Sequence, residues 1–125
     1  MRWYDIAKMK EDLIGEAIKS GHEIADKIRS ASTVEEVDAL DDEIEKFSDF
    51  VDENFGVYDD IGEKNCELSM MLFMAAEEKV RYLEYHQDKP QEIGDESVKD
   101  FEEMLDSREW ANSLHGVSPD SKNAE

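Results

Sequence analysis

The spacing of apolar residues is helical along the whole chain. No stretch alternates polar and apolar residues in the manner of a β-strand, and the two prolines, Pro90 and Pro119, lie outside the periodic segments. The pattern therefore predicts an all-α protein. Three long helices and a short fourth helix, joined by short loops, are most simply arranged as an antiparallel helical bundle.

The first predicted helix runs from Asp5 to about Ser30. Ser20 and Gly21 lie in its middle. Because glycine costs about 1 kcal/mol relative to alanine inside a helix, this pair marks a place where a kink or a break is expected.

The second predicted helix begins at Ser32 or Thr33, where Thr33 and Glu36 form a capping-box pattern. Its apolar residues step alternately by three and four positions, as in a coiled-coil seam. These seam residues are Val37, Leu40, Ile44, Phe47 and Val51. Gly56 is suited to end the helix.

The third predicted helix runs from Asp59 or Asp60 to about Gln87, and its middle is apolar nearly all round. Such a helix is expected at the centre of the bundle. Met70, Met71 and Met74 are interpreted as core residues, and an adaptable binding face is the alternative. If the short fourth helix leaves one side uncovered, a second copy of the chain would complete the burial, so a homodimer stays open.

The C-terminal part of the chain is predicted to hold a loop, a short helix and a tail. Residues Gln91–Glu96 are expected to form the loop, and Ser97 opens a helix that would end at Gly116 at the latest. Residues 117–125 are small and polar and are expected to form a flexible tail. The chain of 125 residues thus forms one helical domain over residues 1–116.

The net charge of −20 is concentrated in two segments. Residues 31–62 carry a net charge of −11 and residues 91–125 carry −7, whereas residues 1–30 are neutral. A surface of this sign repels nucleic acid and anionic membranes, so direct binding to either is not expected.

The acidic residues of the second helix form a continuous stripe beside its apolar seam. The stripe consists of Glu35, Asp38, Asp42, Glu45, Asp49 and Asp52. Neighbouring members lie about 5–6 Å apart along the helix axis, which is broadly similar to the spacing of phosphates along a nucleic-acid strand. Like charges at these spacings repel by a few tenths of a kcal/mol per pair, so the stripe is not explained by helix stability. It is a solvated face or a surface that imitates a polyanion.

The sequence contains no catalytic signature, and we expect neither an enzyme nor a bound cofactor or metal. Asp52–Glu63 has the length of an EF-hand loop, but Val57 occupies the position that requires glycine, so a plain connector is the better interpretation. The histidines are isolated, and no Glu-x-x-His pair occurs. Two E-x-x-E/D pairs on facing helices, as in all-α nucleotide pyrophosphohydrolases, are also not evident.

Cellular location is indicated by the single cysteine and by the apolar runs. Cys66 is the only cysteine, is interpreted as a buried small hydrophobe, and suits a reducing cytosol. The chain start has no apolar region typical of a signal peptide. The longest strictly apolar run, Met70–Ala76, is too short to span a bilayer. A cytoplasmic protein is therefore expected.

Composition and charge layout resemble those of the DNA mimics and counter-defence proteins of phages, including anti-restriction and anti-CRISPR proteins. This similarity of type implies a non-enzymatic inhibitor or regulator. It would occupy the basic groove of a nucleic-acid-binding protein through the acidic stripe, together with the acidic C-terminal segment. The alternative is a self-associating structural or adaptor module in which the apolar seam and the Met-rich helix bind and the acid only solvates the surface.

Overall fold

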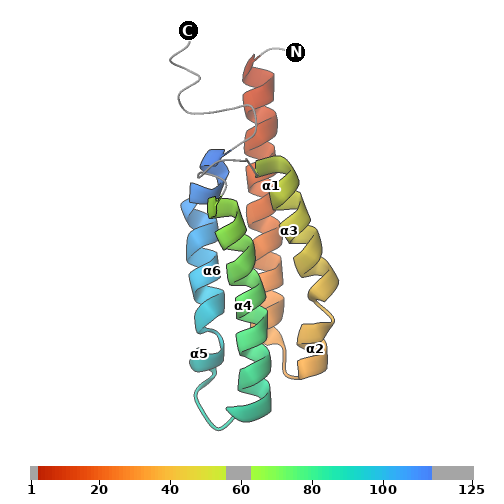
Figure 1. Ribbon diagram of the computed structural model, residues 1–125, viewed down its shortest axis with the longest axis vertical. Helices are drawn as coiled ribbons and strands as arrows, with labels where there is room; N and C mark the ends of the chain where they lie inside the picture. The colour runs from red at the N-terminus through yellow and green to blue at the C-terminus, as the bar shows by residue number, and fades with distance from the viewer. Residues whose placement is uncertain (1–2, 56–62, 114–125) are drawn as a thin grey trace.

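The computed structural model describes residues 3–55 and 63–113, and within these ranges all regular structure is helical (Figure 1). Four main helices run antiparallel to their neighbours in sequence: α1 (Trp3–Ser30), α3 (Asp41–Phe55), α4 (Glu63–Tyr85) and α6 (Glu96–Ser107). Three short elements complete the fold: α2 (Val34–Asp38), α5 (Gln91–Gly94) and the 3₁₀ helix η2 (Glu109–Ser113). The predicted all-α antiparallel bundle is confirmed.

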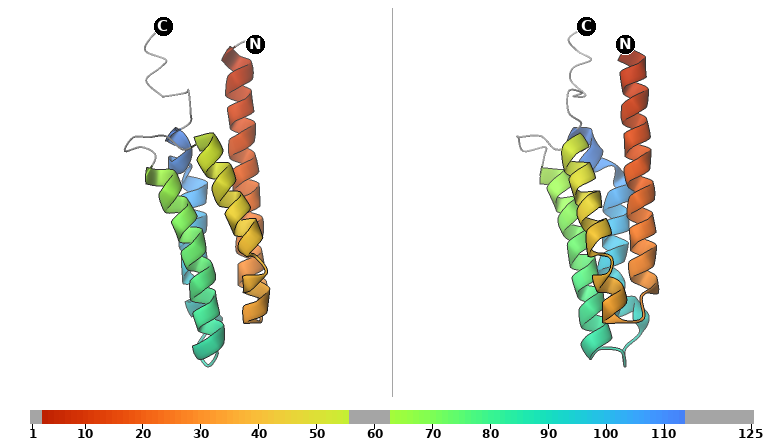
Figure 2. Two further views of the ribbon diagram at one scale, coloured as in Figure 1. Left: turned by 45° about the vertical axis from the view of Figure 1, so that its right-hand side comes forward. Right: turned by 90° about the vertical axis from the view of Figure 1, so that its right-hand side faces the viewer.

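The main helices occupy four corners in the order α1, α3, α4 and α6, with α6 returning to α1 (Figures 1 and 2). Helices α3 and α6 consequently stand at opposite corners. Helix α4 contacts every other described element, but it stands at one corner of the bundle with one side exposed, so the predicted position at the centre is not met.

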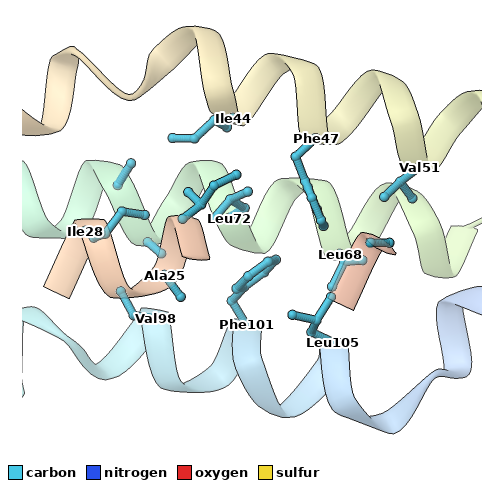
Figure 3. Close-up of a cluster of buried hydrophobic side chains, with 14 of the residues drawn as sticks. Ala25, Ile28, Ile44, Phe47, Val51, Leu68, Leu72, Val98, Phe101 and Leu105 are labelled. Atoms are coloured by element: carbon cyan, nitrogen blue, oxygen red, sulfur yellow. The ribbon is translucent and has the colours of Figure 1, made fainter. Parts of the chain in front are cut away.

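The core lies between the four helices, where buried side chains from each of them meet (Figure 3). The predicted seam points inward, and all five of its residues are buried. The rings of Phe47 on α3 and Phe101 on α6 meet edge to face with centroids 5.8 Å apart. At one end of the bundle, the rings of Trp110 and Phe55 pack with their centroids 4.9 Å apart. The ring nitrogen of Trp110 donates a hydrogen bond to the Leu105 carbonyl.

Gly21 does not break the helix, because α1 is continuous from Trp3 to Ser30. Gly21 is instead buried where α6 approaches α1. A Cβ atom at this position would lie 2.5 Å from a methyl carbon of Leu105. The missing side chain therefore permits the close approach of the two helices.

The predicted second helix is interrupted, which corrects the continuous helix expected from the sequence. The Thr33 hydroxyl caps α2 by accepting a hydrogen bond from the Glu36 amide, as predicted. After α2, the Leu40 amide donates to the Val37 carbonyl three residues back, and a new helix then begins. Carboxylates are favourable in the first turn of a helix, and α3 has three there, so the interruption places them at a positive helix end.

The predicted loop after α4 contains the short helix α5, and the last helix begins one residue earlier than predicted, at Glu96. Helix α6 ends at Ser107, because Arg108 adopts a left-handed conformation with φ of 61°. Several other predictions lie outside the described residues: the start of the third helix at Asp59 or Asp60, the helix ends at Gly56 and Gly116, and the tail at 117–125.

The buried cation Lys79 joins three parts of the chain, and the sequence analysis did not identify it. Its side chain is 1% exposed. The ammonium group donates hydrogen bonds to the Asp95 carboxylate at 2.9 Å and to the Arg29 carbonyl at 3.1 Å. It also lies 5.7 Å from the centre of the Tyr82 ring. Lys79 thus fixes α4 to the end of α1 and to the junction between α5 and α6.

Replacing Lys79 with alanine is expected to lower the free energy of unfolding by about 3 kcal/mol, because Asp95 would keep a poorly hydrated charge without its counter-ion. Urea unfolding followed by circular dichroism measures the change. Lys99→Ala removes an exposed lysine from α6 and is the matched control, with an expected change within about 0.5 kcal/mol. Equal effects of the two substitutions would show that the buried pair has no special role.

Candidate protein-binding surface

All six residues of the predicted acidic stripe are exposed. Glu35 and Asp38 lie on α2, and Asp42, Glu45, Asp49 and Asp52 lie on α3. Their side chains point away from the core because the seam residues between them are buried. The interruption between α2 and α3 therefore leaves the stripe on the outside of the molecule.

The α3 part of the stripe extends from the solvent side of α3 to the flank that faces α4. Lys27 on α1 forms an ion pair with Glu43 at 2.7 Å, which identifies the opposite flank of α3 as the one facing α1. Residues advance by about 100° around a helix axis, so Glu45 lies about 200° from Glu43. The carboxylates on α3 consequently line its solvent side and its border with α4.

The charge of the stripe is largely uncompensated within the described part of the chain. The side chains of Glu35, Asp38, Asp42, Glu45 and Asp49 form no hydrogen bond or ion pair there. The one basic residue of α2 and α3 is Lys46. It lines a groove between α1 and α3 with Glu16 and Glu23. These five carboxylates are therefore available to a partner.

An exposed apolar row on α4 lies next to the stripe. Met70 is 61% exposed, Phe73 44% and Met74 56%, whereas Met71 is half-buried. The expectation that these methionines are core residues is thus wrong for Met70 and Met74. Cys66 is exposed as well, which corrects its interpretation as a buried hydrophobe. The bundle supplies too few neighbouring helices to cover α4 all round.

The acidic residues in the described part of the C-terminal segment do not extend the stripe. The outer face of α6 exposes Glu96, Asp100 and Glu103. Because α6 and α3 stand at opposite corners of the bundle, these residues lie on a different side of the molecule (Figure 1). One flat contact surface cannot include both.

Positively charged side chains lie instead where α1 packs against α6. His22 lies between two carboxylates, with its Nδ1 at 2.7 Å from Glu102 and its Nε2 at 2.7 Å from Asp106. Arg29 also pairs with Glu102. Burial alone would lower the pKa of His22, but the hydrogen bonds and charges of Asp106 and Glu102 outweigh it and raise the pKa.

No group of His, Cys, Asp and Glu side chains in the described ranges is arranged to hold a metal ion. Around His22 the two carboxylates contact opposite ring nitrogens, so they do not converge on one point. Most of Asp52–Glu63 lies outside these ranges. Among the described helices, none is both long and apolar enough to cross a membrane.

Comparisons with protein-family models, with curated proteins and with solved structures found no match. The properties of the surface therefore have to be argued from its own residues. Periodicity identified the acidic stripe. It offered the methionines of α4 only as an alternative binding face, and it did not identify the two carboxylates around His22. Both features depend on how the helices are placed in space.

The stabilisation from His22 is expected to depend on pH. The raised folded-state pKa means that the bridged imidazolium stabilises the fold fully below the unfolded value of about 6.5. This contribution is lost as the pH rises through the folded value. The stability difference between the wild-type protein and His22→Gln should therefore shrink as the pH rises from below 6.5 into the alkaline range.

Urea unfolding at a series of pH values measures this difference. Asp106→Asn is the matched control, because it removes one carboxylate and should move the decline to lower pH. A stability difference that grows with pH would contradict the assignment of His22 as a bridging cation.

Proposed function

We propose that this chain is a non-enzymatic acidic protein of the cytoplasm that binds a basic nucleic-acid-binding protein. Its acidic stripe would imitate the charge of a nucleic-acid strand and occupy the partner's basic groove. The observation that carries this proposal is the row of six exposed carboxylates on α2 and α3. Five of them have no intramolecular partner within the described part of the chain.

The geometry of the stripe supports charge imitation. From Asp42 to Asp52 the carboxylates span about 15 Å of helix axis. Repulsion between them costs the helix stability, and that cost is relieved when a partner supplies cations. The net charge of −20 would also accelerate encounter with a basic protein and make binding sensitive to salt.

This mode of action would make the protein an inhibitor or regulator, as in the phage-type anti-restriction and anti-CRISPR proteins that it resembles in composition. Occupation of a basic groove excludes nucleic acid because both ligands need the same cations. No covalent chemistry is required, and the stripe needs only to stay exposed and rigid. A helix packed through a buried seam meets that requirement.

The exposed apolar row of α4 favours a second candidate, in which the chain self-associates as a structural or adaptor module. Salt distinguishes the two candidates. Association through apolar surface persists or strengthens at high salt, whereas charge imitation weakens as the Debye length falls.

Charge reversal of the stripe tests the proposal. The triple variant Asp42→Lys, Glu45→Lys and Asp49→Lys is expected to weaken partner binding by at least about tenfold, which corresponds to about 1.4 kcal/mol, and so to lower partner recovery. The measurement is a pull-down from nuclease-treated bacterial lysate with elution by a salt gradient. Circular dichroism should show unchanged helix content.

The matched control reverses Glu96, Asp100 and Glu103 to lysine on the outer face of α6. It changes the net charge by the same amount as the stripe variant. Each variant reverses one residue in the first turn of a helix, Asp42 in α3 and Glu96 in α6. Its partner recovery should stay close to that of the wild-type protein. If the two triple variants lose binding equally, net charge rather than the stripe controls recognition. If only the bait is recovered at every salt concentration, self-association is the better explanation.

A further inference from the structure

The apolar row of α4 is the one group of large apolar side chains in the described residues that lies together and exposed on a main bundle helix. Met70, Phe73 and Met74 are spaced by three and four positions, so they share one side of α4. The opposite side carries the fully buried Leu72 and Ala75. Single exposed apolar residues are ordinary, whereas apolar side chains that gather in one exposed patch are typical of interaction sites.

The row borders the acidic stripe. Glu78 accepts hydrogen bonds from Ser97, which identifies the flank of α4 that faces α6. Phe73 lies about 140° around the helix from Glu78, on the flank that faces α3. Met70 lies about 80° from Glu78, on the outer side of α4, and Met74 lies about 40° from it, nearer to α6. Since α3 and α4 are neighbours and the α3 part of the stripe reaches the border with α4, Phe73 and the nearest carboxylates of the stripe lie on the same face of the bundle.

This combination selects the chemistry of an occupant. An amphipathic helix docks by placing large apolar side chains on an apolar row, and methionine side chains adapt to differently shaped partners. A helix that also carries lysine or arginine along one flank would neutralise the adjacent stripe. Charge complementarity therefore favours a basic amphipathic helix.

A second copy of the chain fits the same face poorly. A two-fold interface brings identical patches together, so each stripe would lie close to the stripe of the other copy. Every chain carries a net charge of −20, and no cation within the described part of α2 and α3 other than Lys46 is available to offset it. Repulsion would oppose the apolar contact.

We propose that Met70, Phe73 and Met74, together with the acidic stripe, form one docking surface for a basic amphipathic helix of a partner protein. This inference rests on the proposed function and specifies the element through which the partner makes contact. The apolar row provides binding free energy that salt does not screen, and the stripe provides orientation and speed of encounter.

Titration with two synthetic peptides tests the inference. The first peptide has about 18 residues, or five helical turns, with leucines on one face and lysines along a flank. The second has the same composition with its leucines distributed around the helix. In protein labelled on its methionine methyl groups, the first peptide should shift the signals of Met70 and Met74. Met9 on α1, which is 51% exposed, is the internal control and should not shift.

Calorimetry on variants measures the contribution of each part. The triple variant Met70→Gln, Phe73→Gln and Met74→Gln is expected to weaken binding of the first peptide by about tenfold or more. Met9→Gln should change it by less than about twofold, since it alters an exposed methionine away from the row. The triple variant Asp42→Asn, Glu45→Gln and Asp49→Asn should also bind the first peptide more weakly. Its binding should depend less on salt concentration than that of the wild-type protein.

The outcomes separate this inference from the proposed function. If both peptides bind equally and the α4 variant binds like wild type, only charge is recognised; the docking surface is then refuted and the acidic stripe is not. If binding survives neutralisation of the stripe, the proposed function fails, and with it the basic character of the occupant. If neither peptide binds, or if wild type sediments as a dimer and the α4 variant as a monomer, a basic helix is not the occupant.

Discussion

The chain has fourteen lysines and arginines for thirty-four aspartates and glutamates, and the position of these few cations governs the electrostatics of the bundle. Several of them, together with His22, bridge helices. Lys27 joins α1 to α3, His22 and Arg29 join α1 to α6, and Lys79 joins α4 to Asp95. Cations that are held between helices cannot also neutralise the carboxylates on the outer side of α2 and α3. The cations that join the helices are thus not available to the acidic stripe, and the stripe keeps its negative charge.

The buried Lys79 shows how one residue constrains several elements. An ammonium group without water needs acceptors on more than one side. The Arg29 carbonyl comes from the last turn of α1, and the Asp95 carboxylate comes from the start of α6. The last turn of α1 and the start of α6 must both be in place for the ammonium group to be buried. At the lower end of the bundle in Figure 1, the polar contacts of Lys79 therefore act together with the apolar packing of the core.

The sequence predicted the features that depend on periodicity within one helix. Val37 and Ile44 are buried and Asp42 and Asp49 are exposed, as their spacing indicates. It did not predict features that depend on neighbours distant in sequence. Lys79 and its acceptor at Arg29 are separated by 50 residues. The exposure of Met70 depends on how many helices surround α4, and an apolar run alone cannot indicate that number.

The exposed Cys66 has a practical consequence. It lies on the same side of α4 as Met70, one helical turn away, and it is the only cysteine in the chain. A thiol-reactive dye or spin label would therefore attach at one defined position beside the apolar row, without any substitution. The native thiol can thus act as a built-in reporter, because the accessibility of its sulfur to an alkylating reagent records whether that face is covered.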